Sequence, residues 1–265
     1  MVREPDGKIC GNGLNIDNMK RLFTLLILTC LISTTNAQQV RFKWKAKRVL
    51  MDSTWNKPEE PRVKAIIDYY KPEMDRLMQQ KVGESAREMR SGRPESLLSN
   101  FAVDAILDYS RKQTDKEVHF SLTNFGGIRS TLPAGDVRRY DIFSIFPFEN
   151  YLVVIDLRGS SVKKLFNTLA KRVEALSGNV KLVIEGENLT QALIDGVQVD
   201  ESKIYRVATL DFLLDGGDNM SALSEALLVE QTGVLIRDAI FAKIEELTAG
   251  GNKIDYKLDG RVLIK

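Results

Sequence analysis

Apolar residues recur three and four positions apart in several stretches of the chain, and this spacing predicts helices with one buried face. The first stretch, 63–78, contains Pro72, which predicts a kink or two helices instead of one straight rod. The second, 97–112, follows Ser96, a residue suited to cap a helix N-terminus. Two more helices are expected at 159–169 and 234–247, and a short helix or a turn is expected at 141–146.

Alternating or continuously apolar runs predict the strands. They are expected at 40–44, 118–122, 151–157, 180–185, 204–210 and 260–264, with a hairpin at 193–199 around Asp195-Gly196. The run at 151–157 is apolar on both sides, which is typical of a strand buried on both faces. Strands and helices mix without strict alternation, and no repeat is visible. The pattern therefore predicts a single domain over 62–265, of the α+β or mixed α/β class.

The beginning of the chain has the pattern of a secretory signal peptide at 19–37. Lys20-Arg21 precedes an apolar run, 22–32, and small residues follow it up to Ala37. The run is shorter than the roughly 20 residues that a membrane-spanning helix needs. We expect cleavage after Ala37 and a periplasmic or secreted protein. Residues 1–18 stay unassigned, a misassigned upstream start being one interpretation, and 38–61 form an N-terminal extension.

Cysteine content and charge exclude several classes of function. Cys10 and Cys30 both precede the expected cleavage point, so the mature chain has no disulfide and no thiolate chemistry. Cys30 as a lipid attachment site is the alternative, although Thr29 stands where a smaller residue is expected. The mature part would carry 34 basic and 33 acidic residues. Without a basic excess, binding to a nucleic acid polymer is not expected.

The residues that usually perform hydrolysis are scarce. The one histidine, His119, falls in a predicted strand, where a packed or surface role is commoner than metal binding. Asp211, Asp215 and Asp218 come near a cation-binding loop, but a glycine turn with solvated acids explains them more simply. A nucleophile elbow, a phosphate-binding P-loop and a dinucleotide fingerprint are absent. No catalytic residue, metal ligand or cofactor is therefore expected in this chain.

Two glycine loops, 124–129 and 215–219, each follow a predicted strand and could contact a ligand. The first ends in Arg129, whose planar guanidinium suits a carboxylate, a phosphate or a sugar edge. Phe148 and Phe212 lie near these loops in the sequence and could clamp a flat heterocycle, as base-stacking proteins do. Packing of both rings into the core is the open alternative.

Four motifs occur in order, at 124–129 (Asn-Phe-Gly-Gly-Ile-Arg), 146–150 (Phe-Pro-Phe-Glu-Asn), 157–159 and 205–218. Together they resemble the C-terminal, substrate-binding domain of the 5′-nucleotidase family, which includes UDP-sugar hydrolases and cyclic-phosphodiesterase relatives. The resemblance covers roughly 62–265, and it implies a mixed sheet with packed helices. The segment 99–105 also resembles a helix of that family.

The resemblance implies a role for each matched residue. Phe148 and Phe212 would sandwich the base, Asn124 would bond the nucleoside, and Asp218 would hold the ribose hydroxyls. Arg129 would contact ribose or phosphate, and a further family arginine corresponds to Arg111, with Lys112 as the alternative. The implied substrate-binding set is Asn124, Gly126, Gly127, Arg129, Phe148, Phe212, Asp218 and Arg111.

The sequence departs from the family pattern in three places. Phe125 and Asn219 stand where the family usually has glycines, and the 24 residues from Gln38 to Pro61 cannot hold the family's metallophosphatase domain. We therefore expect an exported nucleotide- or nucleoside-binding domain of a 5′-nucleotidase-type phosphohydrolase. A separate metallophosphatase chain would carry the divalent metal and complete nucleotide breakdown. The alternatives are a nucleoside-scavenging or sensing protein without hydrolase activity, and a degenerate domain kept for structure or interaction.

Overall fold

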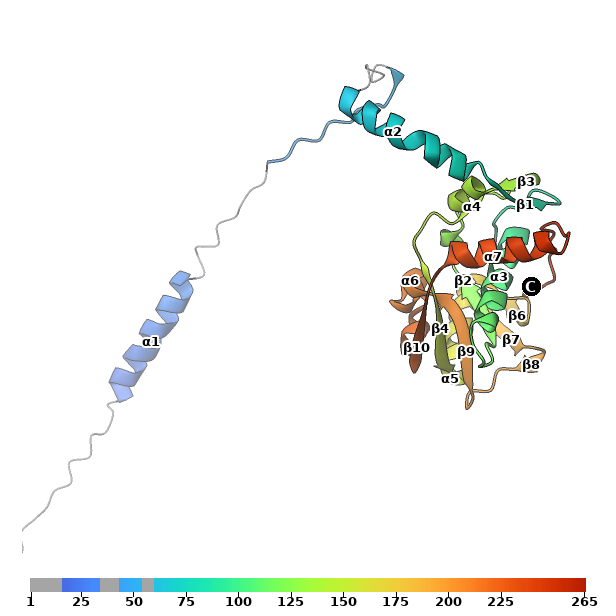
Figure 1. Cartoon of the computed structure of the whole chain (residues 1–265). Helices are drawn as coiled ribbons and strands as arrows, with labels where there is room; N and C mark the ends of the chain where they lie inside the picture. The colour runs from blue at the N-terminus through green and yellow to red at the C-terminus, as the bar shows by residue number, and fades with distance from the viewer. Residues whose placement is uncertain (1–15, 34–42, 54–59) are drawn as a thin grey trace, which may run out of the picture. The chain divides into compact units, whose positions relative to one another are not determined.

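The computed structural model describes residues 16–33, 43–53 and 60–265 (Figure 1). The chain divides into two compact units, Met1–Pro58 and Glu59–Lys265. In the first unit, the described residues form helix α1 (Ile16–Ser33), and 43–50 has no regular secondary structure. None of the helices in the described part of the chain is long and apolar enough to cross a membrane.

Two expectations concern the first unit. The cleavage point after Ala37 lies outside the described residues, as do three residues of the strand expected at 40–44. The other two residues of that stretch, Lys43 and Trp44, are described and belong to no strand.

The second unit contains the remaining helices and all the described strands. Its helices are α2 (Pro61–Met78), α3 (Leu97–Lys112), α4 (Arg139–Ile145), α5 (Gly159–Lys171), α6 (Asp211–Leu214) and α7 (Ile236–Ala249). Its strands are β1 (Lys81–Ser85), β2 (Phe120–Thr123), β3 (Gly135–Arg138), β4 (Tyr151–Arg158), β5 (Ala175–Leu176), β6 (Val180–Glu185), β7 (Asn188–Ile194), β8 (Val197–Gln198), β9 (Ile204–Leu210), β10 (Leu228–Leu235) and β11 (Val262–Ile264). The predicted mixed α/β class is confirmed.

A five-stranded sheet with the order β10-β4-β9-β2-β5 forms the centre of the second unit. β2 and β9 run parallel, and the other neighbouring pairs are antiparallel. Helices α3 and α5 cover its two faces. Successive residues of a strand point to opposite faces of the sheet. On one face, the Phe120 ring of β2 lies 5.4 Å from the Phe166 ring of α5. On the other face, the Ser121 hydroxyl of β2 donates to the Val103 carbonyl of α3.

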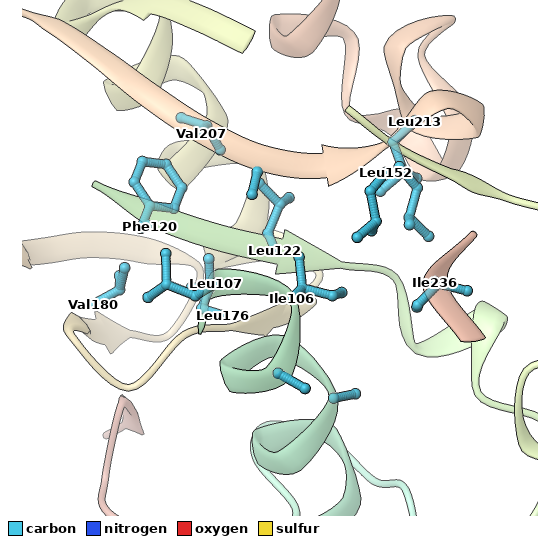
Figure 2. Close-up of a cluster of buried hydrophobic side chains, with 14 of the residues drawn as sticks. Ile106, Leu107, Phe120, Leu122, Leu152, Leu176, Val180, Val207, Leu213 and Ile236 are labelled. Carbon is cyan, nitrogen blue, oxygen red and sulfur yellow. The ribbon is translucent and has the colours of Figure 1, made fainter. Parts of the chain in front are cut away.

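The hydrophobic core extends through this sheet to both layers of helices. Figure 2 shows part of it: Phe120 and Leu122 from β2, Val207 from β9, and Ile106 from α3. Each of these four side chains is fully buried. Burial of a large apolar side chain contributes about 1.5–3 kcal/mol, so this layered core holds the sheet edge in place.

A second, four-stranded sheet has the order β11-β6-β7-β8, in which only β11 and β6 run parallel. The predicted hairpin around Asp195-Gly196 is confirmed, because Ile194 pairs with Val197 across it. Asp195 and Gly196 both have positive φ angles, 51° and 77°, as a two-residue hairpin turn requires.

A kink or two helices were predicted at 63–78, and the structure has a single helix there. Pro72 lies inside one uninterrupted helix, α2, and none of the residues of this helix is buried. Four strands, β1, β3, β5 and β10, were not predicted. β1 and β3 form a two-stranded ribbon of mostly polar residues, and β10 is an exposed edge strand. Neither the ribbon nor β10 has the buried apolar face that produces an alternating pattern, and β5 has only two residues.

Gly159 joins β4 to α5 at a point where no side chain fits. A Cβ atom there would lie 1.9 Å from the Asp200 carbonyl oxygen. We expect Gly159→Ala to destabilise the fold by about 1–3 kcal/mol through overpacking, as measured by urea denaturation. Gly92→Ala is the matched control, since nothing lies within 4 Å of its added Cβ. Equal stability of the two variants would contradict the prediction.

Candidate functional site

Three chain segments meet at one end of the five-stranded sheet. β2 and β9 are parallel, so their carboxyl ends lie at the same edge, and β4 begins there because it runs antiparallel to β9. The turn Phe125–Gly127 follows β2, helix α6 and the turn Gly217–Asn219 follow β9, and the segment 146–150 leads into β4. The carboxyl end of a sheet is a common place for ligands.

A cavity of about 280 Å³ lies between these segments. It is lined by Asn124, Gly126, Gly127, Phe148, Asn150, Phe212 and Asp218. The structure thus brings together six of the eight residues that the sequence placed in a binding site. These residues are far apart in the sequence, and they lie close together because the strands that carry them are neighbours in the sheet.

Phe148 and Phe212 are not core residues. Their side chains are 45% and 50% exposed, whereas other phenylalanines, such as Phe120 and Phe166, are fully buried in the core. The Phe212 ring lies close to the backbone of Gly217, where an added Cβ would be 2.8 Å from the ring. Exposed aromatic rings on the wall of a cavity are suited to stack on a flat ring.

Asn124 and Asp218 form the polar part of the wall. The Asn124 Nδ2 donates to Asp218 Oδ2 at 2.5 Å, and this bond fixes the orientation of the amide. The Asn124 Oδ1 is then left buried without a hydrogen-bond partner, in a side chain only 5% exposed. A buried acceptor without a partner is costly, so the site is suited to a ligand that donates a hydrogen bond.

The backbone around these two side chains has little freedom. Asp218 and Asn219 both adopt the left-handed conformation, with φ of 53° and 65°, which Asp and Asn tolerate better than most residues. A Cβ at Gly127 would lie 2.9 Å from Asn124 Oδ1, and one at Gly126 would lie 3.3 Å from Asn124 Nδ2. A side chain at Gly127 would therefore displace the Asn124 amide, and one at Gly126 would crowd it.

The two predicted arginines differ in their placement. Arg129 lies at the rim, where its Nη1 donates to the Gly126 carbonyl and its guanidinium carbon is 5.8 Å from the Phe148 ring centroid. Arg111 is not among the residues that line the cavity. It donates instead to the carbonyls of Val118 and His119 beside the end of α3. The structure therefore does not bring Arg111 into the site.

Two residues that the sequence reasoning did not assign belong to this region. Asn150 lines the cavity, and its place in the 146–150 motif was an available signal. Arg237, on α7, is buried and donates to the carbonyls of Phe146 and Phe148 at 3.1 and 3.2 Å. It holds the segment that carries the Phe148 ring, and nothing in the local sequence marked it.

A buried carboxylate, Glu174, supports the glycine turn from below. It is 1% exposed and accepts the Phe125 backbone N–H at 2.6 Å. It also pairs with Arg93, and Arg172 Nε lies 3.4 Å from its Oε1. The Arg93 guanidinium in turn covers the Phe125 ring at 4.7 Å. This contact gives Phe125, the departure from the family's glycine, a structural role.

We expect Glu174→Leu to lower the stability by about 1–3 kcal/mol, because it leaves the buried Phe125 N–H and two guanidinium groups without their acceptor. Glu174→Gln keeps an acceptor oxygen and should lose less. The measurement is chemical denaturation, with the exposed Glu187→Leu as control. A leucine variant as stable as the control would show that Glu174 does not support the turn.

The structure gives the remaining candidate groups packing roles. His119 Nδ1 accepts the backbone N–H of Arg206 at 2.9 Å, and its ring meets the Tyr205 ring edge-on. Asp211 Oδ1 accepts the backbone N–H groups of Tyr151 and Phe212. Among the residues that the structure describes, no group of three or more His, Cys, Asp or Glu side chains is placed to hold a metal ion.

Comparisons with known proteins agree with the geometry. A family profile described as the C-terminal domain of 5′-nucleotidase matches residues 73–225. The trifunctional nucleotide phosphoesterase protein YfkN of Bacillus subtilis is 28% identical over 225 residues, which cover 77% of this chain and 15% of that protein. Protein UshA of Yersinia enterocolitica is 33% identical over 132 residues, covering 48% of this chain and 24% of UshA.

Solved structures show the same fold. The crystal structure of a 5′-nucleotidase precursor from Thermus thermophilus superposes with a TM-score of 0.66 at 24% sequence identity, covering 76% of this chain and 42% of that one. The present chain spans less than half the length of each of these three relatives.

Proposed function

This chain belongs to the family of 5′-nucleotidase C-terminal domains, and from that premise we propose that it binds a nucleotide or nucleoside in the cavity at the carboxyl end of the sheet. The observation that carries the proposal is the pairing of two exposed rings, Phe148 and Phe212, with the unpartnered Asn124 oxygen and the Asp218 carboxylate.

Each part of a nucleoside has a matching group. The base stacks between Phe148 and Phe212, and the amide of Asn150 faces its edge. The Asp218 carboxylate accepts hydrogen bonds from the ribose hydroxyls, which are charge-assisted and therefore strong. Asn124 Oδ1 accepts one further donor from the ligand. Arg129, at the rim, supplies a guanidinium for the phosphate.

We place the hydrolytic step on a metallophosphatase domain of a separate chain, which would hold the divalent metal. Two facts support a hydrolytic step outside the matched residues: the matched family is described as a C-terminal domain, and the relatives extend well beyond the part that this chain matches. The location of that domain on a separate chain is part of the proposal. In such a complex the present chain acts as the substrate-recognition component of nucleotide breakdown.

Calorimetric titration of the chain with adenosine, AMP and UDP-glucose tests the binding, with EDTA in one series and Mn²⁺ in another. We expect binding that needs no metal. We also expect no phosphate release from AMP by this chain alone in Mn²⁺. Lack of binding to all three ligands would refute the recognition role, and rapid hydrolysis by the chain alone would refute the separate catalytic chain.

We further propose that the chain is exported. The proposal rests on the basic pair Lys20-Arg21 and the apolar run 22–32, which lie within helix α1. N-terminal sequencing of the mature protein is expected to begin at Gln38. A protein that keeps α1 would contradict cleavage, and a lipid on Cys30 would establish the alternative.

A further inference from the structure

A second cavity, of about 350 Å³, shares Asp218 with the first. The last turn of α5 and Arg172 form one side of it, and Asp218 with Asn219 form the other. Because Asp218 lines both cavities, a group bonded to its carboxylate from the main cavity stands at the entrance to the second. We refer to this second space as the side cavity.

The side cavity carries a pair of cations next to the shared carboxylate. Arg172 Nη2 lies 3.5 Å from Asp218 Oδ1, and Arg172 Nε lies 3.4 Å from Glu174 Oε1. The Arg172 side chain is 52% exposed, so a ligand can reach it alongside these two carboxylates. Lys171, the last residue of α5, is exposed beside it. The C-terminal end of a helix is partly negative, and these two cations offset both that helix end and Asp218.

We propose that the side cavity receives a phosphate attached to the ribose 2′ or 3′ oxygen of the bound nucleotide. The inference rests on the proposed function, in which Asp218 binds the ribose hydroxyls. A carboxylate serves free ribose hydroxyls, and an arginine nearby accommodates a ribose phosphate, in dinucleotide-binding folds. Here Asp218 and Arg172 supply both groups at one place, so both forms of the ribose are accommodated.

The exposure of Arg172 sets how much affinity the second phosphate adds. Arg172 is half exposed, and Asp218 opposes an incoming phosphate, so the gain is that of an exposed ion pair. We expect about fivefold tighter binding, which corresponds to about 1 kcal/mol at 1.4 kcal/mol per factor of ten. Salt should weaken this preference, because exposed pairs are screened.

The test compares the dissociation constants of AMP and adenosine 3′,5′-bisphosphate, measured by calorimetry on the full chain. The 5′-phosphate is present in both ligands, so their ratio isolates the second phosphate. We expect a ratio of about five for the unaltered chain and about one for Arg172→Gln. Lys171→Gln should fall between them. Arg158→Gln, at the other end of α5, is the control and should keep the full ratio.

Three outcomes would overturn the inference. If AMP binds and the bisphosphate binds no better, the side cavity is not a phosphate site, while the proposed function stands. If the preference survives both Arg172→Gln and Lys171→Gln, the second phosphate binds elsewhere. If neither ligand binds, the proposed function fails and this inference fails with it. The phosphate on the ribose could be a terminal monoester or the phosphodiester of a longer chain. A 5′-phosphorylated adenosine dinucleotide distinguishes the two. If it binds as much more tightly than AMP as the bisphosphate does, the side cavity also accepts a phosphodiester.

Discussion

Replacing both Phe148 and Phe212 by alanine is expected to remove nucleoside binding and leave the fold intact. Stacking on an aromatic side chain is worth about 1–3 kcal/mol per base, a loss of roughly 5- to 140-fold for each ring. Both rings are about half exposed, so their removal leaves no internal cavity. The effect on the free energy of unfolding should therefore stay within about 0.5 kcal/mol.

Titration with adenosine measures the first effect, and urea denaturation measures the second. Tyr140→Ala is the matched control, because Tyr140 is an exposed aromatic residue of α4 that does not line the cavity. Each single variant should lose part of the affinity, and the double variant more than either. A double variant that binds adenosine as the unaltered chain does would place the ligand outside this cavity.

Replacing Arg261 by methionine is expected to have the largest effect on stability. Arg261 is 4% exposed and donates to both oxygens of Asp104 on α3 and to both oxygens of Asp259. It also donates to the Leu176 carbonyl of β5. Breaking a buried ion pair from one side typically costs about 3–5 kcal/mol, because the remaining charge is uncompensated.

The loss of stability caused by Arg261→Met should depend on pH. Burial raises the pKa of Asp104, and the hydrogen bonds and charge of Arg261 offset part of that rise. Burial also acts to raise the pKa of Asp259, but Arg261 lowers it by more, to below its ordinary value. Without Arg261, both carboxyl groups would have folded-state pKa values above their unfolded values. Such groups destabilise the fold increasingly as pH rises through the acid range.

We therefore expect the penalty of Arg261→Met to be nearly complete at pH 7 and to shrink toward pH 4. Denaturant unfolding of both proteins at the two pH values measures it. Arg87→Met is the control, since Arg87 forms an exposed pair with Asp255 that should contribute at most about 1 kcal/mol. A penalty that is small, or independent of pH, would show that Arg261 is not the counter-ion on which these carboxylates depend.

The Arg261 cluster also explains part of the sequence pattern. Asn100 and Asp104 belong to the segment 99–105, which resembles a helix of the family. Asn100 donates to Glu95 Oε1 and to the Lys257 carbonyl, and Asp104 accepts from Arg261 and from the Gly178 N–H. The polar residues of this helix therefore tie its first turns to the C-terminal segment of the chain, away from the cavity.

Helices and strands with one buried face were predictable from the sequence, because burial imposes a period of 3.6 or 2 on the apolar residues. α3, α5 and α7, together with β4, β6 and β9, lie where the pattern placed them. The glycine turn after β2 was visible in the same way. Elements without a buried face were harder to predict: the exposed edge strand β10 was missed, and α2, none of whose residues is buried, was predicted as helix at 63–78 but with a kink or a break at Pro72.

The sequence by itself marked candidate residues near glycine turns, and its resemblance to the family implied that two phenylalanines, an asparagine and an aspartate among them bind a nucleoside. Only the tertiary structure decided which of them meet. The parallel pairing of β2 with β9, and the antiparallel pairing of β4 with β9, place Asn124, Asp218 and the two rings at one sheet edge. Arg111, which the family resemblance favoured, bonds the Val118 carbonyl beside the end of α3, whereas Arg172, which follows α5, lies beside Asp218. Long-range pairing sets such contacts, and no local period along the chain records it.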